Sequence, residues 1–176
     1  LALCLLSLSR GPCDERKTVI WLRIDQKSCL KGIALAGMRI VVVEPTRSRK
    51  TGSAPRAQRR PRRQNDAQAD ARTRAEGEDE GDDQGAELLT DTVALEAAIR
   101  EVGAESLLCV VSTSSCFAPR CPDDIEAVAR LCSSFGVGHV VNNAYGVQCS
   151  QTCANISRAQ RVGRVDLVIQ STDINF

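Results

Sequence analysis

Residues that could hold a flat nitrogen-containing ring follow two apolar runs in the second half of the chain. Asn142 and Ala144 come at and after the run 137–142, and Ser171 follows the run 165–170. Residues two apart on an extended chain point to the same side. The amide of Asn142 could therefore meet a ring nitrogen while the methyl group of Ala144 packs on the ring. Alone, an Asn-x-Ala triplet is a weak signal, because a turn asparagine gives the same pattern.

The order of these features is typical of folds that bind pyridoxal 5'-phosphate (PLP). PLP requires an amine for its aldehyde, a polar group facing its pyridine nitrogen, flat packing on both ring faces and donors for its phosphate. One strand end commonly supplies the Asn/Asp-x-Ala contact, and the next supplies a lysine that holds the aldehyde as a Schiff base. Ile174 stands at the position expected for that lysine, so the chain has no amine there.

Strand and helix patterns alternate along the chain. Apolar runs predict strands at 18–24, 39–44, 107–111, 137–142 and 165–170, and helical patterns occupy 26–37, 91–102, 122–135 and 151–160. This alternation predicts an α/β fold with a mainly parallel sheet, in which ligands bind at the carboxyl ends of the strands. We therefore expect Asn142, Thr113 and Asp173 near one edge of the sheet. Asp123 and Asp124 are expected in a first helical turn, where they favour the helix dipole.

Residues 46–86 interrupt this alternation and divide the predicted large domain into segments 1–45 and 87–176. The first half of the interruption is basic, the second half is acidic, and large apolar residues are almost absent. Such a segment buries too little apolar surface to offset the entropy of ordering. We predict a disordered, charged insertion. Its basic half could contact RNA, although the acidic half partly neutralises it and the net charge of +1 predicts no general affinity for nucleic acid.

Nine cysteines and one histidine raise the question of a metal site, but no CxxC pair occurs. Cys4, Cys109 and Cys132 lie in apolar runs, where small buried thiols are typical, so we predict no metal site. His139 is interpreted as a satisfied core residue. The opening run 1–6 lacks the basic leader and cleavage site of a signal peptide, which favours a truncated core helix. No run reaches the ~20 apolar residues that a membrane span requires.

Five longer segments carry a more specific resemblance: residues 24–29 (IDQKSC), 112–120 (STSSCFAPR), 139–148 (HVVNNAYGVQ), 161–166 (RVGRVD) and 170–173 (QSTD). In this order they closely resemble the O-phosphoseryl-tRNA(Sec) selenium transferase family, over nearly the whole chain outside the insertion. The resemblance implies the large domain of a fold-type-I PLP-dependent transferase, truncated at both ends. The family's amino-terminal region, which recognises the substrate phosphate, and its carboxyl-terminal small domain would lie outside this chain.

The resemblance also implies an activity. The family converts O-phosphoseryl-tRNA(Sec) to selenocysteinyl-tRNA(Sec): phosphate is eliminated, and selenophosphate then supplies selenium. It implies PLP as cofactor, tRNA(Sec) as partner, a homotetramer in the intact protein, a cytoplasmic location and no membrane association.

Carried over residue by residue, the resemblance places Gln26 and Ala144 on the two faces of the ring. Asn142 would face the ring nitrogen, and Arg161 would contact the tRNA. Without the resemblance, Arg161 is simply a solvated arginine. The complete set of residues expected to contact the cofactor is Gln26, Asn142, Ala144, Thr113 and Ser171, with Lys27 as a possible helper.

Ile174 leaves alternative interpretations open. The chain could be part of the active transferase, with Ile174 an error in the gene model or a real loss. It could instead be a non-catalytic homologue that retains a tRNA-binding surface. A generic nucleotide-binding α/β domain is disfavoured, because no glycine-rich phosphate loop follows the first strand.

Overall fold

Five parallel strands form the central sheet of the computed structural model, which describes residues 1–9, 15–48, 86–115 and 120–171. The strands are β1 (Thr18–Leu22), β2 (Arg39–Val43), β5 (Leu107–Thr113), β6 (Gly138–Asn142) and β7 (Leu167–Ile169), in the order β2-β1-β5-β6-β7. The predicted α/β fold with a parallel sheet is confirmed. The strand order reverses between β1 and β5, and ligands in such sheets bind near that reversal, at the carboxyl ends of the strands.

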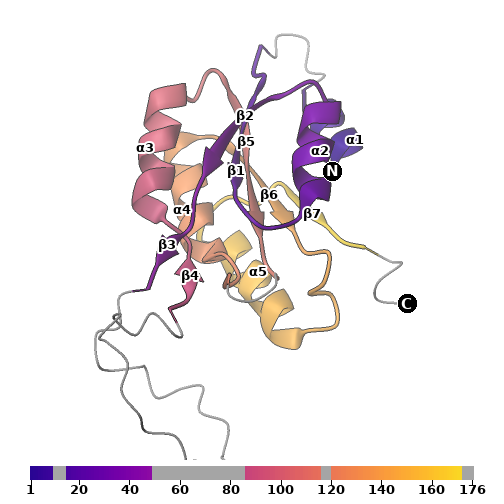
Figure 1. Cartoon of the computed structure of the whole chain (residues 1–176), viewed down its shortest axis with the longest axis vertical. Coiled ribbons are helices and arrows are strands. Elements are labelled where there is room, and N and C mark those ends of the chain that lie inside the picture. Colours follow the sequence, from indigo (N-terminus) through magenta and orange to yellow (C-terminus); the bar gives the residue numbers. More distant parts are fainter. Residues whose placement is uncertain (10–14, 49–85, 116–119, 172–176) are drawn as a thin grey trace, which may run out of the picture. The chain divides into compact units, whose positions relative to one another are not determined.

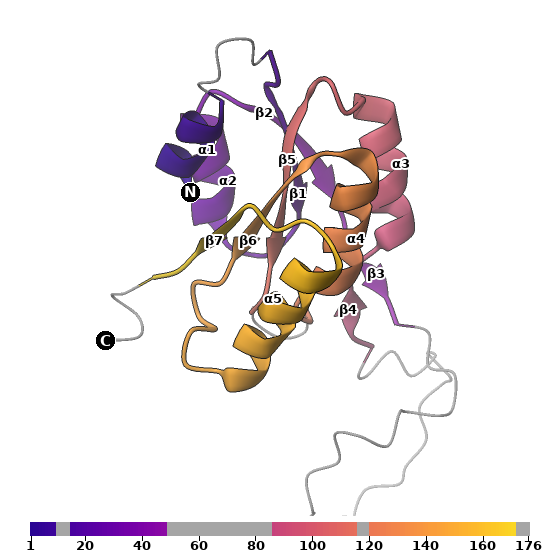
Figure 2. The same ribbon diagram turned by 180° about the vertical axis from the view of Figure 1, so that it is seen from behind.

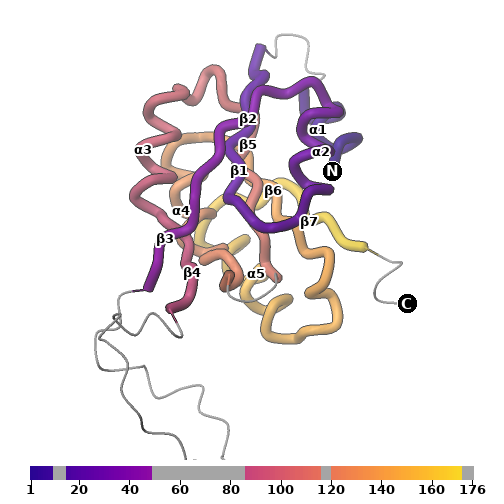
Figure 3. The backbone as a smooth tube through the Cα atoms, in the orientation of Figure 1, coloured from indigo at the N-terminus to yellow at the C-terminus, as the bar shows by residue number. Residues whose placement is uncertain are grey.

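Helices cover both faces of the sheet (Figures 1 and 2). On one side lie α1 (Ala2–Leu8) and α2 (Lys27–Leu35), and on the other lie α3 (Thr92–Val102), α4 (Ile125–Phe135) and α5 (Ser150–Val162). Helices α2 to α5 each lie in the connection between two parallel strands, as the tube in Figure 3 shows, and α1 packs beside α2. The result is a three-layer arrangement.

The core follows from the apolar runs of the central strands. Every residue of β1, β5 and β6 is buried, whereas the two edge strands β2 and β7 are partly exposed. Strands covered by helices on both faces are apolar along their whole length. The predicted burial of Cys109 and Cys132 is confirmed, and Cys4 is half-buried on α1.

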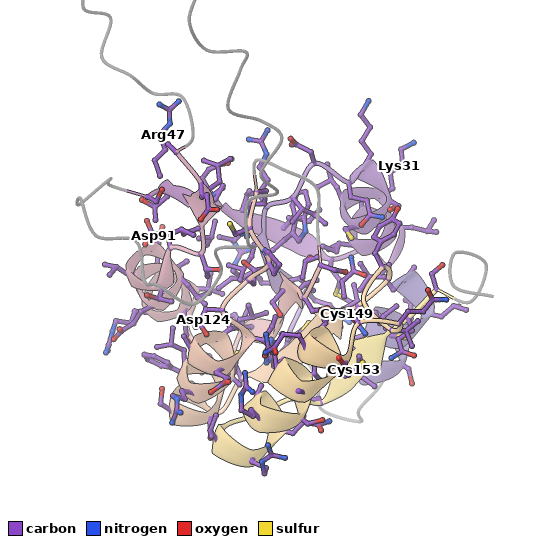
Figure 4. All side chains as sticks on the ribbon, turned by 90° about the horizontal axis from the view of Figure 1, so that it is seen from below. Lys31, Arg47, Asp91, Asp124, Cys149 and Cys153 are labelled. Atoms are coloured by element: carbon purple, nitrogen blue, oxygen red, sulfur yellow. The ribbon has the colours of Figure 1, made fainter. Side chains whose placement is uncertain are left out.

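Aspartates begin two of the helices (Figure 4). Asp91 accepts the Ala94 N–H at 2.8 Å, and Asp124 accepts the Ala127 N–H at 3.0 Å, which satisfies N–H groups that lack a partner in the helix. The prediction that Asp123 and Asp124 lie in the first turn of α4 is wrong, because the helix begins at Ile125 and Asp124 is the capping residue before it.

Asp123 is instead a buried link between segments. Its carboxylate pairs with Arg120, accepts the Thr113 N–H at 2.8 Å and accepts the Thr90 hydroxyl at 2.7 Å. Burial raises the pKa of Asp123, and the Arg120 guanidinium opposes that shift. These bonds hold the carboxyl end of β5 against the segments that precede α3 and α4.

Two short strands, β3 (Thr46–Arg47) and β4 (Leu88–Leu89), pair antiparallel between β2 and α3. The first two residues of the predicted insertion are therefore paired. Residues 49–85 lie outside the described residues, so disorder of the insertion stays a prediction. Across the described ranges, no helix has the length and apolar character needed to cross a membrane.

Candidate functional site

Three strands of the sheet end side by side. Thr113 is the register partner of Asn142, and Asn142 is the register partner of Ile169. Two further backbone hydrogen bonds continue this alignment, from Ser114 N–H to Asn142 O at 3.0 Å and from Asn143 N–H to Ile169 O at 2.7 Å. The predicted proximity of Asn142 and Thr113 is confirmed, and Asp173 lies outside the described residues.

A cavity of about 370 Å³ opens at this edge, on the side of the sheet that carries α1 and α2. Four of the five residues predicted to contact the cofactor line it: Gln26, Asn142, Ala144 and Ser171. The remaining lining residues come from α1, from α2 and from the end of β7: Leu1, Ala2, Ser28, Cys29, Gly32, Ile169 and Gln170. Its volume lies within the ~300–1,000 Å³ range of small-molecule sites.

Gln26 reaches the cavity because it stands at the start of α2. Its N–H donates to Ile24 O at 2.8 Å, which turns the chain after β1, and its carbonyl accepts the Cys29 N–H at 3.2 Å. The residue itself remains extended, with φ −125° and ψ 98°. Its side chain makes no capping bond to the helix and extends to Asn142 instead.

Asn142 is the centre of a small buried network. Its Nδ2 donates to Gln26 Oε1 at 3.3 Å and to Cys29 Sγ at 3.0 Å, and its Oδ1 accepts the Ala144 N–H at 3.2 Å. Cys29 Sγ also donates to Gln26 Oε1, at 3.6 Å. Burial raises the pKa of the Cys29 thiol, which keeps it protonated. Cys29 was not among the predicted site residues, although it lies about one helical turn after Gln26.

Asn143 and Gly146 stabilise the turn that carries Ala144. Asn143 is buried, and its Oδ1 accepts the Ser114 hydroxyl at 2.6 Å. A side chain at Gly146 would place its Cβ only 2.1 Å from Asn143 Oδ1, so the turn requires glycine there. The tight turn fixes Ala144 at the cavity wall.

The other predicted site residues lie elsewhere. Thr113 is buried beside Asn142, and within the described part of the chain its hydroxyl has no hydrogen-bond partner and it does not line the cavity. Arg161 is exposed near the carboxyl end of α5. Lys27 lines a separate hollow with Trp21 and Leu30, and Ile174 lies outside the described residues.

His139 forms a second polar network, on the opposite face of β6. Its Nδ1 lies 2.8 Å from the carbonyl oxygen of Arg164, which can only accept, so Nδ1 carries the hydrogen and Nε2 accepts the Ser112 hydroxyl at 2.7 Å. Its backbone N–H donates to Asp166 Oδ2 at 2.8 Å. Burial lowers the pKa of His139 to about 4. The interpretation of His139 as a satisfied core residue is confirmed.

Metal ligands are not gathered anywhere in the described ranges: no three His, Cys, Asp or Glu side chains there could hold an ion together. The candidate site is therefore the cavity at the ends of β1, β6 and β7, built from an amide network and a tight turn.

The architecture matches that of PLP-dependent enzymes. A solved structure of Oryza sativa TDC with PLP and tryptamine aligns with a TM-score of 0.57 and 14% identity, covering 94% of this chain and 31% of that one. An archaeal O-phosphoseryl-tRNA(Sec) selenium transferase aligns with a TM-score of 0.69 and 22% identity, covering 98% and 31%. The chain thus has the fold of a PLP-dependent transferase large domain.

Sequence comparison defines the family. The family model for O-phosphoseryl-tRNA(Sec) selenium transferase matches residues 1–59 and 78–176, and the chain belongs to that family. The transferase of Dictyostelium discoideum is 42% identical over 176 residues, covering 100% of this chain and 29% of the relative. That of Leishmania donovani is 42% identical over 161 residues, covering 90% and 27%. The chain therefore spans less than a third of the length of these relatives.

Proposed function

We propose that this chain is part of an enzyme that converts O-phosphoseryl-tRNA(Sec) to selenocysteinyl-tRNA(Sec) with selenophosphate, using PLP, in the cytoplasm. Family membership supports the reaction. The observation that carries the cofactor assignment is the convergence of Gln26, Asn142, Ala144 and Ser171 on one cavity. These residues come from segments as far apart in sequence as 26 and 171, and only the fold brings them together.

The residues present fit a pyridine ring. Asn142 offers an amide to the ring nitrogen. Ala144 offers a small methyl group to one face of the ring, and Gln26, at the start of α2, packs against the other face. Ser171 offers a hydroxyl for the phosphate or its surroundings. When bound, PLP supplies an electron-withdrawing ring that stabilises negative charge beside the substrate amine. A neutral amide stabilises a charged ring less than a carboxylate does, and elimination of phosphate, a good leaving group, fits that weaker assistance.

Binding of PLP to the 176-residue chain tests this proposal. Trp21 is the only tryptophan, it is buried, and it lies in the core packed against α2, so its fluorescence reports on this side of the sheet. We expect saturable quenching by PLP. Asn142→Ala should weaken binding about three- to tenfold, the loss of one hydrogen bond. The control is Asn155→Ala on α5, where the amide bonds Gln151 and Arg158 outside the cavity. Equal affinities for the two variants would contradict the assignment.

A second candidate is a non-catalytic homologue that retains a tRNA-binding surface. Ile174 favours it, because the chain has no amine where the family's Schiff-base lysine is expected. Both candidates share tRNA(Sec) as partner and a homotetramer as the intact assembly. They differ in whether the cofactor becomes covalently attached, which the Ile174→Lys variant described below decides.

A further inference from the structure

Within the described residues, the side-chain amide of Asn142 has one hydrogen-bonding position that no partner occupies. Both hydrogens of Nδ2 are directed to acceptors, Gln26 Oε1 at 3.3 Å and Cys29 Sγ at 3.0 Å. Oδ1 accepts one bond, from the Ala144 N–H at 3.2 Å, and an amide oxygen has two lone pairs. Within the described residues, what the side chain can still offer to a ligand in the cavity is therefore an acceptor.

The orientation of this amide is set by its surroundings. A backbone N–H can only donate, so the atom that faces the Ala144 N–H must be the oxygen. A reversed amide would place its NH₂ group against that N–H and its oxygen against Gln26 Oε1. A reversed amide would therefore exchange two hydrogen bonds for two repulsive contacts.

Cys29 closes the network. Its sulfur accepts from Asn142 Nδ2, and its S–H donates to the same Gln26 oxygen that accepts the other Asn142 hydrogen. The Cys29 residue is 5% exposed, lies in the first turn of α2, and lines the cavity. Cys29 therefore bonds two of the residues proposed to contact the ring, Asn142 and Gln26, from one position on a helix.

We propose that Cys29 is a positioning residue that holds Asn142 so that Oδ1 accepts a hydrogen bond from a protonated ring nitrogen of the ligand. The inference rests on the proposed function, in which that ligand is PLP. It adds a specificity that the family resemblance does not contain: the cavity selects the ring in its N–H form. An amide free to turn would present NH₂ instead and bind the unprotonated ring equally well.

The nitrogen resonance of PLP labelled with ¹⁵N in the ring tests this directly, because it reports whether the ring nitrogen carries a proton. The ligand is titrated with the 176-residue chain at a pH where free PLP has a mostly unprotonated ring nitrogen. We expect the bound resonance to move toward the protonated value. In Cys29→Ala the Asn142 Nδ2 loses its 3.0 Å acceptor and the amide keeps only its longer bonds to Gln26 and Ala144. The bound resonance should therefore move part of the way back toward that of the free ligand, and affinity should fall about three- to tenfold.

Two matched variants separate positioning from packing. Cys29→Ser keeps an acceptor and a donor at the same place and should preserve the protonated signal. Cys132→Ala removes an equally buried thiol from α4, on the other face of the sheet, and should also preserve it. Loss of the protonated signal in Cys132→Ala as well would overturn the assignment of Cys29.

A second ligand keeps the test independent of any variant. In the PLP analogue that has C–H in place of the ring nitrogen, no N–H is present, and the wild-type chain should bind it about three- to tenfold more weakly than PLP. Equal binding, or saturable PLP binding with an unprotonated ring, would overturn this inference and leave the proposed cofactor intact. No saturable binding of PLP would overturn both.

Discussion

Two buried polar networks are centred on His139 and Asn142, which lie three residues apart on β6. They differ in how many of their hydrogen-bonding groups have partners. The His139 network, on the side of α4 and α5, joins a fully buried ring to Ser112 and Arg164 and leaves neither ring nitrogen available. The Asn142 network, on the side of α1 and α2, lines a cavity and leaves one lone pair of Oδ1 available. The comparison indicates that burial and hydrogen bonding alone do not mark a site. A cavity beside an incompletely paired group does.

The largest expected effect concerns the missing amine. Ile174→Lys should convert non-covalent PLP binding into covalent attachment, detected by borohydride reduction and mass spectrometry of the adduct. The unmodified chain is the control and should yield no adduct. An adduct on another lysine of the isoleucine form, or none on the lysine form, would show that position 174 is wrongly assigned.

Removing the central side chain of each network should lower the free energy of unfolding by different amounts. His139→Ala should lower the free energy of unfolding by about 3–5 kcal/mol, because it leaves a cavity and two unpaired buried groups. Asn142→Ala should cost about 1 kcal/mol, because the partners that it leaves unpaired line a cavity that water can enter. Chemical denaturation of the two variants measures both values. Similar losses would remove the distinction between the two networks.

Acid should act on the His139 network first. The folded pKa of about 4 lies below the ordinary 6.5, so the unfolded chain takes up the proton first and stability falls as pH drops through this window. Between pH 6.5 and about pH 5 the loss should be about 2 kcal/mol. His139 is the only histidine, so His139→Gln should flatten the unfolding free energy over that range. An unchanged slope in the variant would assign the effect to other groups.

Two arginines on α5 show the same contrast between a paired and an available side chain, and here we expect the smallest effect, on tRNA binding. Arg158 pairs with Glu126 at 2.7 Å, whereas Arg161 is exposed and has no ion pair within the described residues. Arg161→Ala should weaken tRNA binding and lower the slope of log affinity against log salt by about one, as expected for one lost phosphate contact. Arg158→Ala is the matched control and should leave the slope nearly unchanged. Equal slopes for both variants would leave Arg161 an ordinary surface charge.

Much of this organisation could be predicted from the sequence. The apolar runs of β1, β5 and β6 identify buried parallel strands, and Asn142 and Ala144 follow from their spacing at a strand end. Cys29 could not be predicted, since its role depends on Asn142, 113 positions away in the sequence. Asp123 was misplaced because its sequence signal fits a helix start, whereas pairing with Arg120 and Thr113 decides its position.

The central claim is that the Asn142 network binds the cofactor ring and the His139 network does not. A ¹H–¹⁵N NMR titration of the labelled chain with PLP tests it most directly. We predict that the side-chain amides of Asn142 and Gln26 and the backbone amide of Ala144 shift together along one saturable curve, while the His139 ring and backbone signals stay fixed. Shifts centred on His139, or changes at Asn142 that never saturate, would contradict the account.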